Sequence, residues 1–310
     1  MPRGFSYALE VLTRKFLHQT IGAIGLGTLT WGKDTDEFEA REQIELFIEA
    51  GGTFFDTSLD FHPSSLKILQ HGLQDKERDK VHLSLHLKVS PSRRELVQQI
   101  EHALDALSVE YLDYVVIEPC LDFDAWLSIS DEISRLYEAR MFDALLFRNV
   151  PAWKSVRLQA TLARNLYAGE HFDYSLLNPC SEEVFEQVRN QKQKIIATSS
   201  LASGVLTGKY RATIPADSRA ASPHLGHITK RYFTALNSAI VEAADKAAQG
   251  MQVSTAAIAL AWLLHQDIVG CAVVGPRTVA QLRGLLNESD FELPNAIFQA
   301  LNDVAEIPYA

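Results

Sequence analysis

The chain has 310 residues, of which 47% are hydrophobic and 22% are charged, and its formal net charge at pH 7 is -10. This composition predicts a globular protein with one large core, and nothing in it requires a second domain. A sequence pI of about 5.5 argues against nucleic acid or an anionic membrane as a partner, which leaves a small-molecule substrate or a nucleotide.

The cysteines and the N-terminus predict a cytoplasmic protein. Cys120, Cys180 and Cys271 are odd in number, lack CxxC spacing and lie in or near apolar runs, which is typical of buried thiols in a reducing compartment. The short apolar run at the N-terminus is interrupted by Glu10 and lacks the continuous apolar core of a secretory signal. No window approaches about 20 consecutive apolar residues, so we expect no transmembrane helix.

Short apolar runs alternate with amphipathic stretches along the chain. The predicted strands are 23–28, 53–57, 81–87, 112–117, 144–147, 171–174, 194–198 and 270–274. The predicted helices are 38–50, 93–107, 124–140, 152–166, 181–191, 253–265 and 278–286. Alternation of this kind predicts a parallel sheet with right-handed crossovers. About eight such units favour an α/β fold, a single (β/α)₈ TIM barrel spanning 1–310, over an open sheet.

A doubly wound dinucleotide-binding fold is the main competitor of the barrel. Gly22, Gly25 and Gly27 cluster at the first strand, but their order is GxxGxG rather than GxGxxG, and no long helix follows directly. That fold is therefore disfavoured. A tight turn and a close-packed strand explain these glycines.

Ionisable residues follow three successive predicted strands. Asp56 ends the second strand, Lys88 follows the third and Glu118 follows the fourth. Each residue alone fits a solvated strand end. Because barrel enzymes place their working groups at the carboxyl ends of strands, the three together predict one shared site.

Several segments carry a family resemblance. They are LGTLTWG (26–32), GGTFFDTSLDF (51–61), LSLHLK (83–88), LDYVVIE (112–118), IATSSL (196–201) with GVLTGKY (204–210), and VGPRT (274–278) with Gln281. Together they resemble the aldo-keto reductases, NADP-dependent oxidoreductase barrels, over nearly the whole chain. No metal-ligand spacing, nucleophile elbow or Walker loop accompanies them.

The resemblance implies a catalytic site with substituted residues. In that family a tyrosine protonates a carbonyl oxygen while NADPH delivers hydride, and an aspartate and a lysine lower the tyrosine's pKa. Asp56 and Lys88 match the two supporting residues, so we expect them to form an ion pair. Phe61 stands in the tyrosine position and Glu118 in the histidine position. Loss of a general acid typically costs about 10²–10⁴ in rate, so carbonyl reduction is expected to be weak.

Two alternatives remain open for this site. His86 lies two residues before Lys88 on the same strand face, so a register shift would put His86 in the lysine position. We favour Lys88, because the segment then matches without a gap. His62, beside Phe61, is an alternative proton donor if its loop turns inward, and an exposed loop histidine otherwise.

The resemblance also implies a nucleotide site that has changed most at its nicotinamide end. There the family carries a Ser-Asn pair, a glutamine that holds the carboxamide and a stacked aromatic ring, where this chain has Arg148-Asn149, His171 and Thr198. At the adenosine end, Arg277 suits the 2′-phosphate of NADP. The other residues expected at that end are Ser199, Leu201, Gly275, Thr278 and Gln281, while Gly284-Leu285 replaces a Glu-Asn pair that is common near the adenine.

Residues 212–230 are rich in small and turn-forming residues, which predicts an excursion rather than a helix. The family often covers its cofactor here, and Arg219 is then a candidate phosphate contact. Two hypotheses follow for the whole chain. The first is an NADP(H)-dependent oxidoreductase with altered chemistry that acts on a carbonyl or a related small molecule. The second is an inactive relative that binds a nucleotide or a protein partner.

Overall fold

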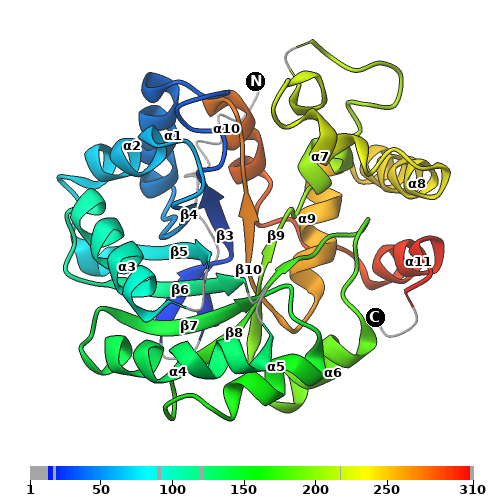
Figure 1. Cartoon of the computed structure of the whole chain (residues 1–310). Coiled ribbons are helices and arrows are strands. Elements are labelled where there is room, and N and C mark those ends of the chain that lie inside the picture. Colours follow the sequence, from blue (N-terminus) through cyan, green and yellow to red (C-terminus); the bar gives the residue numbers. More distant parts are fainter. Residues whose placement is uncertain (1–12, 17–18, 89–91, 119–121, 217, 308–310) are drawn as a thin grey trace.

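The computed structural model describes all residues except 1–12, 17–18, 89–91, 119–121, 217 and 308–310. Eight parallel strands close into a barrel in the order β10-β3-β4-β5-β6-β7-β8-β9 (Figure 1). The strands are β3 (Ile24–Gly27), β4 (Phe54–Ser58), β5 (His82–Lys88), β6 (Leu112–Glu118), β7 (Phe142–Arg148), β8 (Tyr167–Asp173), β9 (Lys194–Thr198) and β10 (Val269–Val274). All eight overlap predicted strands, so the predicted (β/α)₈ barrel is confirmed.

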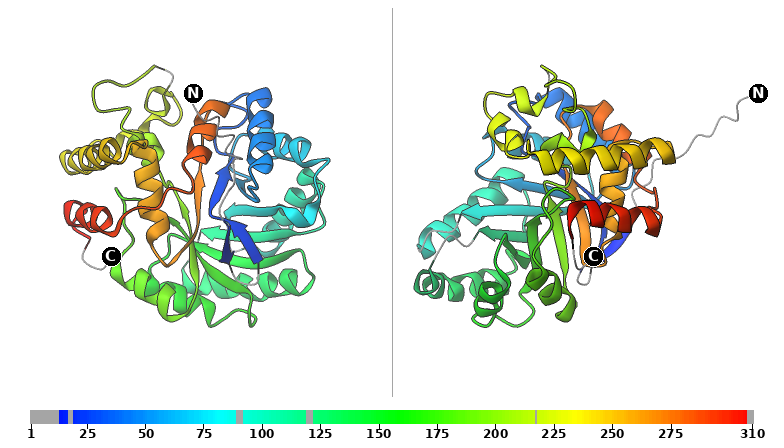
Figure 2. Two further views of the ribbon diagram at one scale, coloured as in Figure 1. Left: turned by 180° about the vertical axis from the view of Figure 1, so that it is seen from behind. Right: turned by 90° about the vertical axis from the view of Figure 1, so that its right-hand side faces the viewer.

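Helices surround the barrel on its outside (Figure 2). They are α1 (Glu37–Glu49), α2 (Ser64–Leu73), α3 (Arg93–Leu107), α4 (Phe123–Glu138), α5 (Ala152–Gln159), α6 (Glu182–Asn190), α7 (Gly226–Lys230), α8 (Ala235–Met251), α9 (Thr255–His265), α10 (Val279–Asn287) and α11 (Asn295–Ala305). Most begin at an Asp, Ser or Thr whose side chain accepts a backbone N–H of the first turn. This capping explains why the predicted helix starts agree closely with the observed ones.

Three regions differ from the sequence-based expectation. The fifth helix ends at Gln159 rather than 166, because the following residues turn directly into β8, which starts at Tyr167. Helices α2, α8 and α11 were not predicted; α8 and α11 pack against each other outside the barrel. The segment 212–230 was expected to form no helix, but its described residues include the short helix α7 and a 3₁₀ turn, Arg219–Ala221.

One end of the barrel is covered by a hairpin made of β1 (Thr13–Phe16) and β2 (Gln19–Gly22). Phe16 and Ile21 are buried in one cluster with barrel-interior side chains such as Tyr114. Arg14 donates to the carbonyl oxygens of Leu264 and Val269, at 2.6 and 2.9 Å. Because this end lies at the amino termini of the strands, the carboxyl ends form the accessible mouth.

Two smaller expectations concern cysteines and membranes. Cys180 and Cys271 are buried, as expected, and Cys120 lies outside the described residues. Within the described part of the chain, no single helix is long and apolar enough to cross a membrane. Only α8 and α9 taken together pass that test, and they are bent by 101°.

Gly169 of β8 lies close against the backbone of β9 and offers a test of the fold. Its φ is +152°, and a Cβ there would lie 2.4 Å from the backbone oxygen of Lys194. We expect Gly169→Ala to lower the free energy of unfolding by about 2–4 kcal/mol, because of overpacking and backbone strain. The control is Gly250→Ala in α8, where a Cβ meets nothing within 4 Å and Ala is the better helix former. Urea unfolding of both variants measures this, and equal stabilities would contradict the prediction.

Candidate active site

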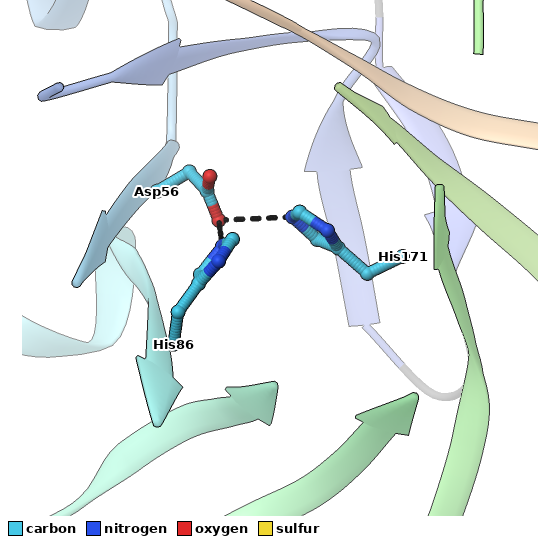
Figure 3. Close-up of side chains that lie close together, drawn as sticks. All are labelled: Asp56, His86 and His171. Atoms are coloured by element: carbon cyan, nitrogen blue, oxygen red, sulfur yellow. Dashed lines mark hydrogen bonds and ion pairs between the residues drawn. The ribbon is translucent and has the colours of Figure 1, made fainter. Parts of the chain in front are cut away.

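Asp56 lies inside the barrel mouth although it is a carboxylate. It sits on β4, its residue is 4% exposed, and its Oδ1 atom faces two imidazole rings. His86 of β5 places Nε2 2.9 Å from this oxygen, and His171 of β8 places Nε2 at 3.3 Å (Figure 3). Burial opposes ionisation of Asp56, but the two imidazoles outweigh it and hold the pKa of this carboxyl below its usual range.

The two histidines differ in what surrounds them. Their rings meet edge to face with centroids 4.4 Å apart. His171 is fully buried, its Nδ1 atom has no hydrogen-bond partner among the described residues, and burial lowers its pKa to about 4 against the opposing effect of Asp56. His171 is therefore neutral near pH 7, and Nε2 carries the proton that it donates to Asp56.

Arg148, the last residue of β7, crosses the mouth and contacts three other strands. Its Nε lies 2.8 Å from Oε1 of Glu118, its Nη1 lies 2.8 Å from Nδ1 of His86, and its Nη2 lies 3.4 Å from Oδ1 of Asp173. A guanidinium only donates, so Nδ1 of His86 accepts and Nε2 bears the proton directed at Asp56. The guanidinium thus sets the tautomer of His86.

This tautomer bears on metal binding. Ligand atoms of Asp56, His86 and His171 lie within 4.8 Å of one another, and two imidazoles with one carboxylate are donors that suit a transition metal. A metal-bound imidazole normally donates its other N–H to an acceptor, whereas Nδ1 of His86 faces the donor Arg148. The geometry therefore favours a hydrogen-bonded cluster over a metal centre.

The expected ion pair between Asp56 and Lys88 is absent from the structure. Lys88 is the last residue of β5; its side chain is 71% exposed and its Nζ lies 3.2 Å from Oδ2 of Asp60. His86 and Lys88 share a strand face, but Lys88 lies one pleat further out and extends above the mouth into solvent. Of the two alternatives, His86 is the residue beside Asp56.

Phe61 and Glu118 reach the mouth, and His62 does not. The ring of Phe61 lies 6.4 Å from that of His86, and both residues line one cavity. Glu118 contacts Arg148 and is half exposed. His62 is exposed ahead of α2, where its Nδ1 accepts the backbone N–H of Ser64, so it does not turn inward.

A cavity of about 550 Å³ runs from this cluster toward the start of α10. One end is lined by Asp56, Phe61, His86 and Arg148, and the other by Arg219, Arg277 and Gln281. Thr198, Ser199, Leu201 and Gly275 line the cavity between them. Most of the residues that the sequence predicts to bind the cofactor therefore line this one cavity.

The cationic end of the cavity is organised by α10. Nη2 of Arg277 lies 3.7 Å from Oδ1 of Asp34, and the backbone N–H of Arg277 donates to Gln281. Arg219 donates to the carbonyl oxygen of Gly275 at 2.9 Å. Thr278 does not line the cavity; it caps α10 by accepting the N–H of Gln281. Two guanidinium groups at one end form a donor set that suits phosphate oxygens.

Two residues expected beside the nicotinamide have other contacts. His171 is directed at Asp56 and does not line the cavity. Asn149 accepts the backbone N–H of Asp173 and lines a second cavity of about 620 Å³. Asp173, which lines both cavities, was not singled out from the sequence, although it is a charged residue at a strand end as Asp56 is.

The buried state of His171 predicts a pH dependence. An unfolded histidine titrates near pH 6.5, and His171 in the fold only near 4, so acid favours the unfolded state between these values. We expect the free energy of unfolding to fall by up to about 1.4 kcal/mol per pH unit in this window, less any opposing change at other groups. His171→Gln should lack this component. Urea titrations of both proteins from pH 7 to about 4 measure it, and an NMR titration of His171 near 6.5 would contradict it.

Comparisons with known proteins agree with this geometry. The sequence profile of the aldo/keto reductase family matches residues 23–306. The chain is 24% identical over 308 residues to Uncharacterized oxidoreductase YrpG of Bacillus subtilis (strain 168), covering 92% of each protein. It is 25% identical over 225 residues to L-glyceraldehyde 3-phosphate reductase of Escherichia coli (strain K12), covering 70% of this chain and 63% of that protein. A further relative is named as a channel subunit. The chain is 24% identical over 267 residues to Probable voltage-gated potassium channel subunit beta of Oryza sativa subsp. japonica, covering 80% of each protein.

Since the family profile spans the whole closed barrel, from β3 through α11, this chain belongs to the aldo/keto reductase family of oxidoreductases.

Proposed function

We propose that this protein binds NADP(H) in the cavity of about 550 Å³ and uses it to reduce a carbonyl or a related small molecule, with weaker or altered chemistry than its family. The observation that carries the proposal is the continuity of this cavity, which joins the Asp56–His86–Arg148 cluster to the cationic end at Arg277. A nucleotide with phosphates at one end and a reactive ring at the other fits such an arrangement.

The phosphate end supports NADP rather than NAD. Arg277 supplies a planar, permanently charged group at the start of α10, and Arg219, which donates to the carbonyl oxygen of Gly275, adds a second cation. Nη2 of Arg277 lies 3.7 Å from Oδ1 of Asp34, a contact that helps to orient the guanidinium. A phosphate would add charge-assisted hydrogen bonds at this end.

The nicotinamide end supports altered chemistry. NADPH, when bound, supplies a hydride. Phe61 has no proton to give. His171, in the position that holds the carboxamide in the family, donates its Nε2 proton to Asp56 instead. The second cavity, which also borders Asp173, provides the space for a substrate beside the first.

Fluorescence titration with NADPH and NADH tests cofactor binding. We expect Arg277→Gln to weaken NADPH binding by about 10- to 100-fold and to change NADH binding little, because charge-assisted hydrogen bonds to the 2′-phosphate are lost. The matched control is Arg283→Gln, an exposed arginine on the same helix that does not line the cavity. No NADPH binding by the native protein would refute the proposal.

Turnover separates an enzyme from an inactive relative. We expect the native chain to oxidise NADPH slowly with a panel of aldehydes, and Phe61→Tyr to be faster, because it restores a hydroxyl beside His86. Equal rates for the two proteins would contradict the role given to Phe61.

The missing hydroxyl also favours a second candidate function. A protein that keeps the phosphate end and lacks the proton donor could act as a nucleotide-binding subunit of a larger assembly; the rice relative is itself named as a channel subunit. NADPH binding with no turnover on any substrate is the result that this candidate predicts.

A further inference from the structure

The guanidinium of Arg148 is held inside the mouth in one orientation. Glu118, His86 and Asp173 contact its three nitrogens one each, and the side chain is 21% exposed. A guanidinium carries five N–H groups, one on Nε and two on each Nη. His86 and Asp173 accept one each, and the buried Nε forms an ion pair with Glu118 but no hydrogen bond, so one N–H on Nη1 and one on Nη2 remain for a ligand. Because Arg148 lines the cavity, a ligand oxygen there is within reach of a fixed cation.

The polar groups next to Arg148 already have hydrogen-bond partners within the protein. Nε2 of His86 donates to Asp56, and its Nδ1 accepts from Arg148. The single hydroxyl proton of Thr198 is shared between Oδ1 of Asp173, at 3.0 Å, and the backbone oxygen of Phe172, at 3.2 Å. Among the described residues that line this end of the cavity, Arg148 is the one permanent cation with N–H groups to spare.

We propose that Arg148 forms an oxyanion-binding site, in which its guanidinium stabilises negative charge on a ligand oxygen beside Phe61. Within the proposed function, on which this role rests, the oxygen is that of the substrate carbonyl. As hydride adds to the carbonyl carbon, the C=O π electrons move onto oxygen, Arg148 stabilises the resulting charge, and water supplies the proton. Arg148 itself keeps its protons, since a guanidinium does not deprotonate in proteins.

The surrounding contacts prepare Arg148 for this role. Charge stabilisation is most effective when the donor is already oriented and needs no rearrangement. Glu118 and Asp173 supply that orientation from β6 and β8.

The probe is 4-nitrophenol, whose anion absorbs visible light and mimics a charged substrate oxygen without turnover. With the native full-length protein we expect bound 4-nitrophenol to ionise at a lower pH than free 4-nitrophenol. Arg148→Gln should abolish this shift and Arg148→Lys should retain part of it, because lysine keeps the charge but not the planar fork. Arg189→Gln, an exposed arginine paired with Asp267 on the outside, is the control and should keep the full shift.

A second readout is aldehyde reduction by NADPH. Arg148→Gln should lower kcat by about 10²–10³ with little change in the affinity for NADPH. Thermal unfolding of each variant checks folding, and if Arg148→Gln does not fold, the comparison of Arg148→Lys with the native protein decides. An equal shift in native and Arg148→Gln protein, or no shift in the native protein, overturns the role of Arg148. A phenol shift without NADPH binding supports the oxyanion site and refutes the proposed function.

Discussion

The mouth of this barrel is organised around a desolvated carboxylate. Removing Asp56 from water costs several kcal/mol unless donors compensate, and its Oδ1 receives two imidazole N–H groups from β5 and β8. His86 can donate to Asp56 because Arg148 from β7 occupies its other nitrogen, and Arg148 in turn is held by Glu118 from β6. One buried charge thereby links five consecutive strands at their carboxyl ends.

Most of the barrel could be predicted from the sequence, because its signals are local. Alternating apolar runs located all eight strands, and amphipathic runs located most of the crossover helices, but not α2 between β4 and β5. The hairpin at the closed end was not predicted, since β1 and β2 are short and Phe16 and Ile21 become buried only against the completed barrel. The predicted helix 152–166 runs past the observed end of α5 at Gln159. Helical propensity alone does not show where the chain must turn back into β8.

The candidate site was predictable to different degrees at its two ends. Arg277 and Gln281 lie in one short segment at the start of α10. Because they are close in the sequence, they are also close in the structure, and the sequence motif alone predicts that they meet. At the mouth, side chains from separate strands meet, and their positions depend on how far along its strand each residue lies. Lys88 and His86 point to the same face, yet only the closed barrel shows that Lys88 extends past the mouth while His86 reaches Asp56.

The position of Arg148 has a consequence for how this family is compared. In a closed barrel the strand ends form a ring, so a charge missing from one strand can be supplied to the same place by another. A match by sequence position puts Lys88 in the lysine position, although in the barrel His86 lies beside Asp56 and Lys88 extends into solvent. In the structure the imidazole of His86 lies between Asp56 and the guanidinium of Arg148. The cation near Asp56 is therefore contributed by β7 instead of β5. Barrels with substituted catalytic positions are therefore better sorted by the charges that converge at the mouth than by the identity of single aligned residues.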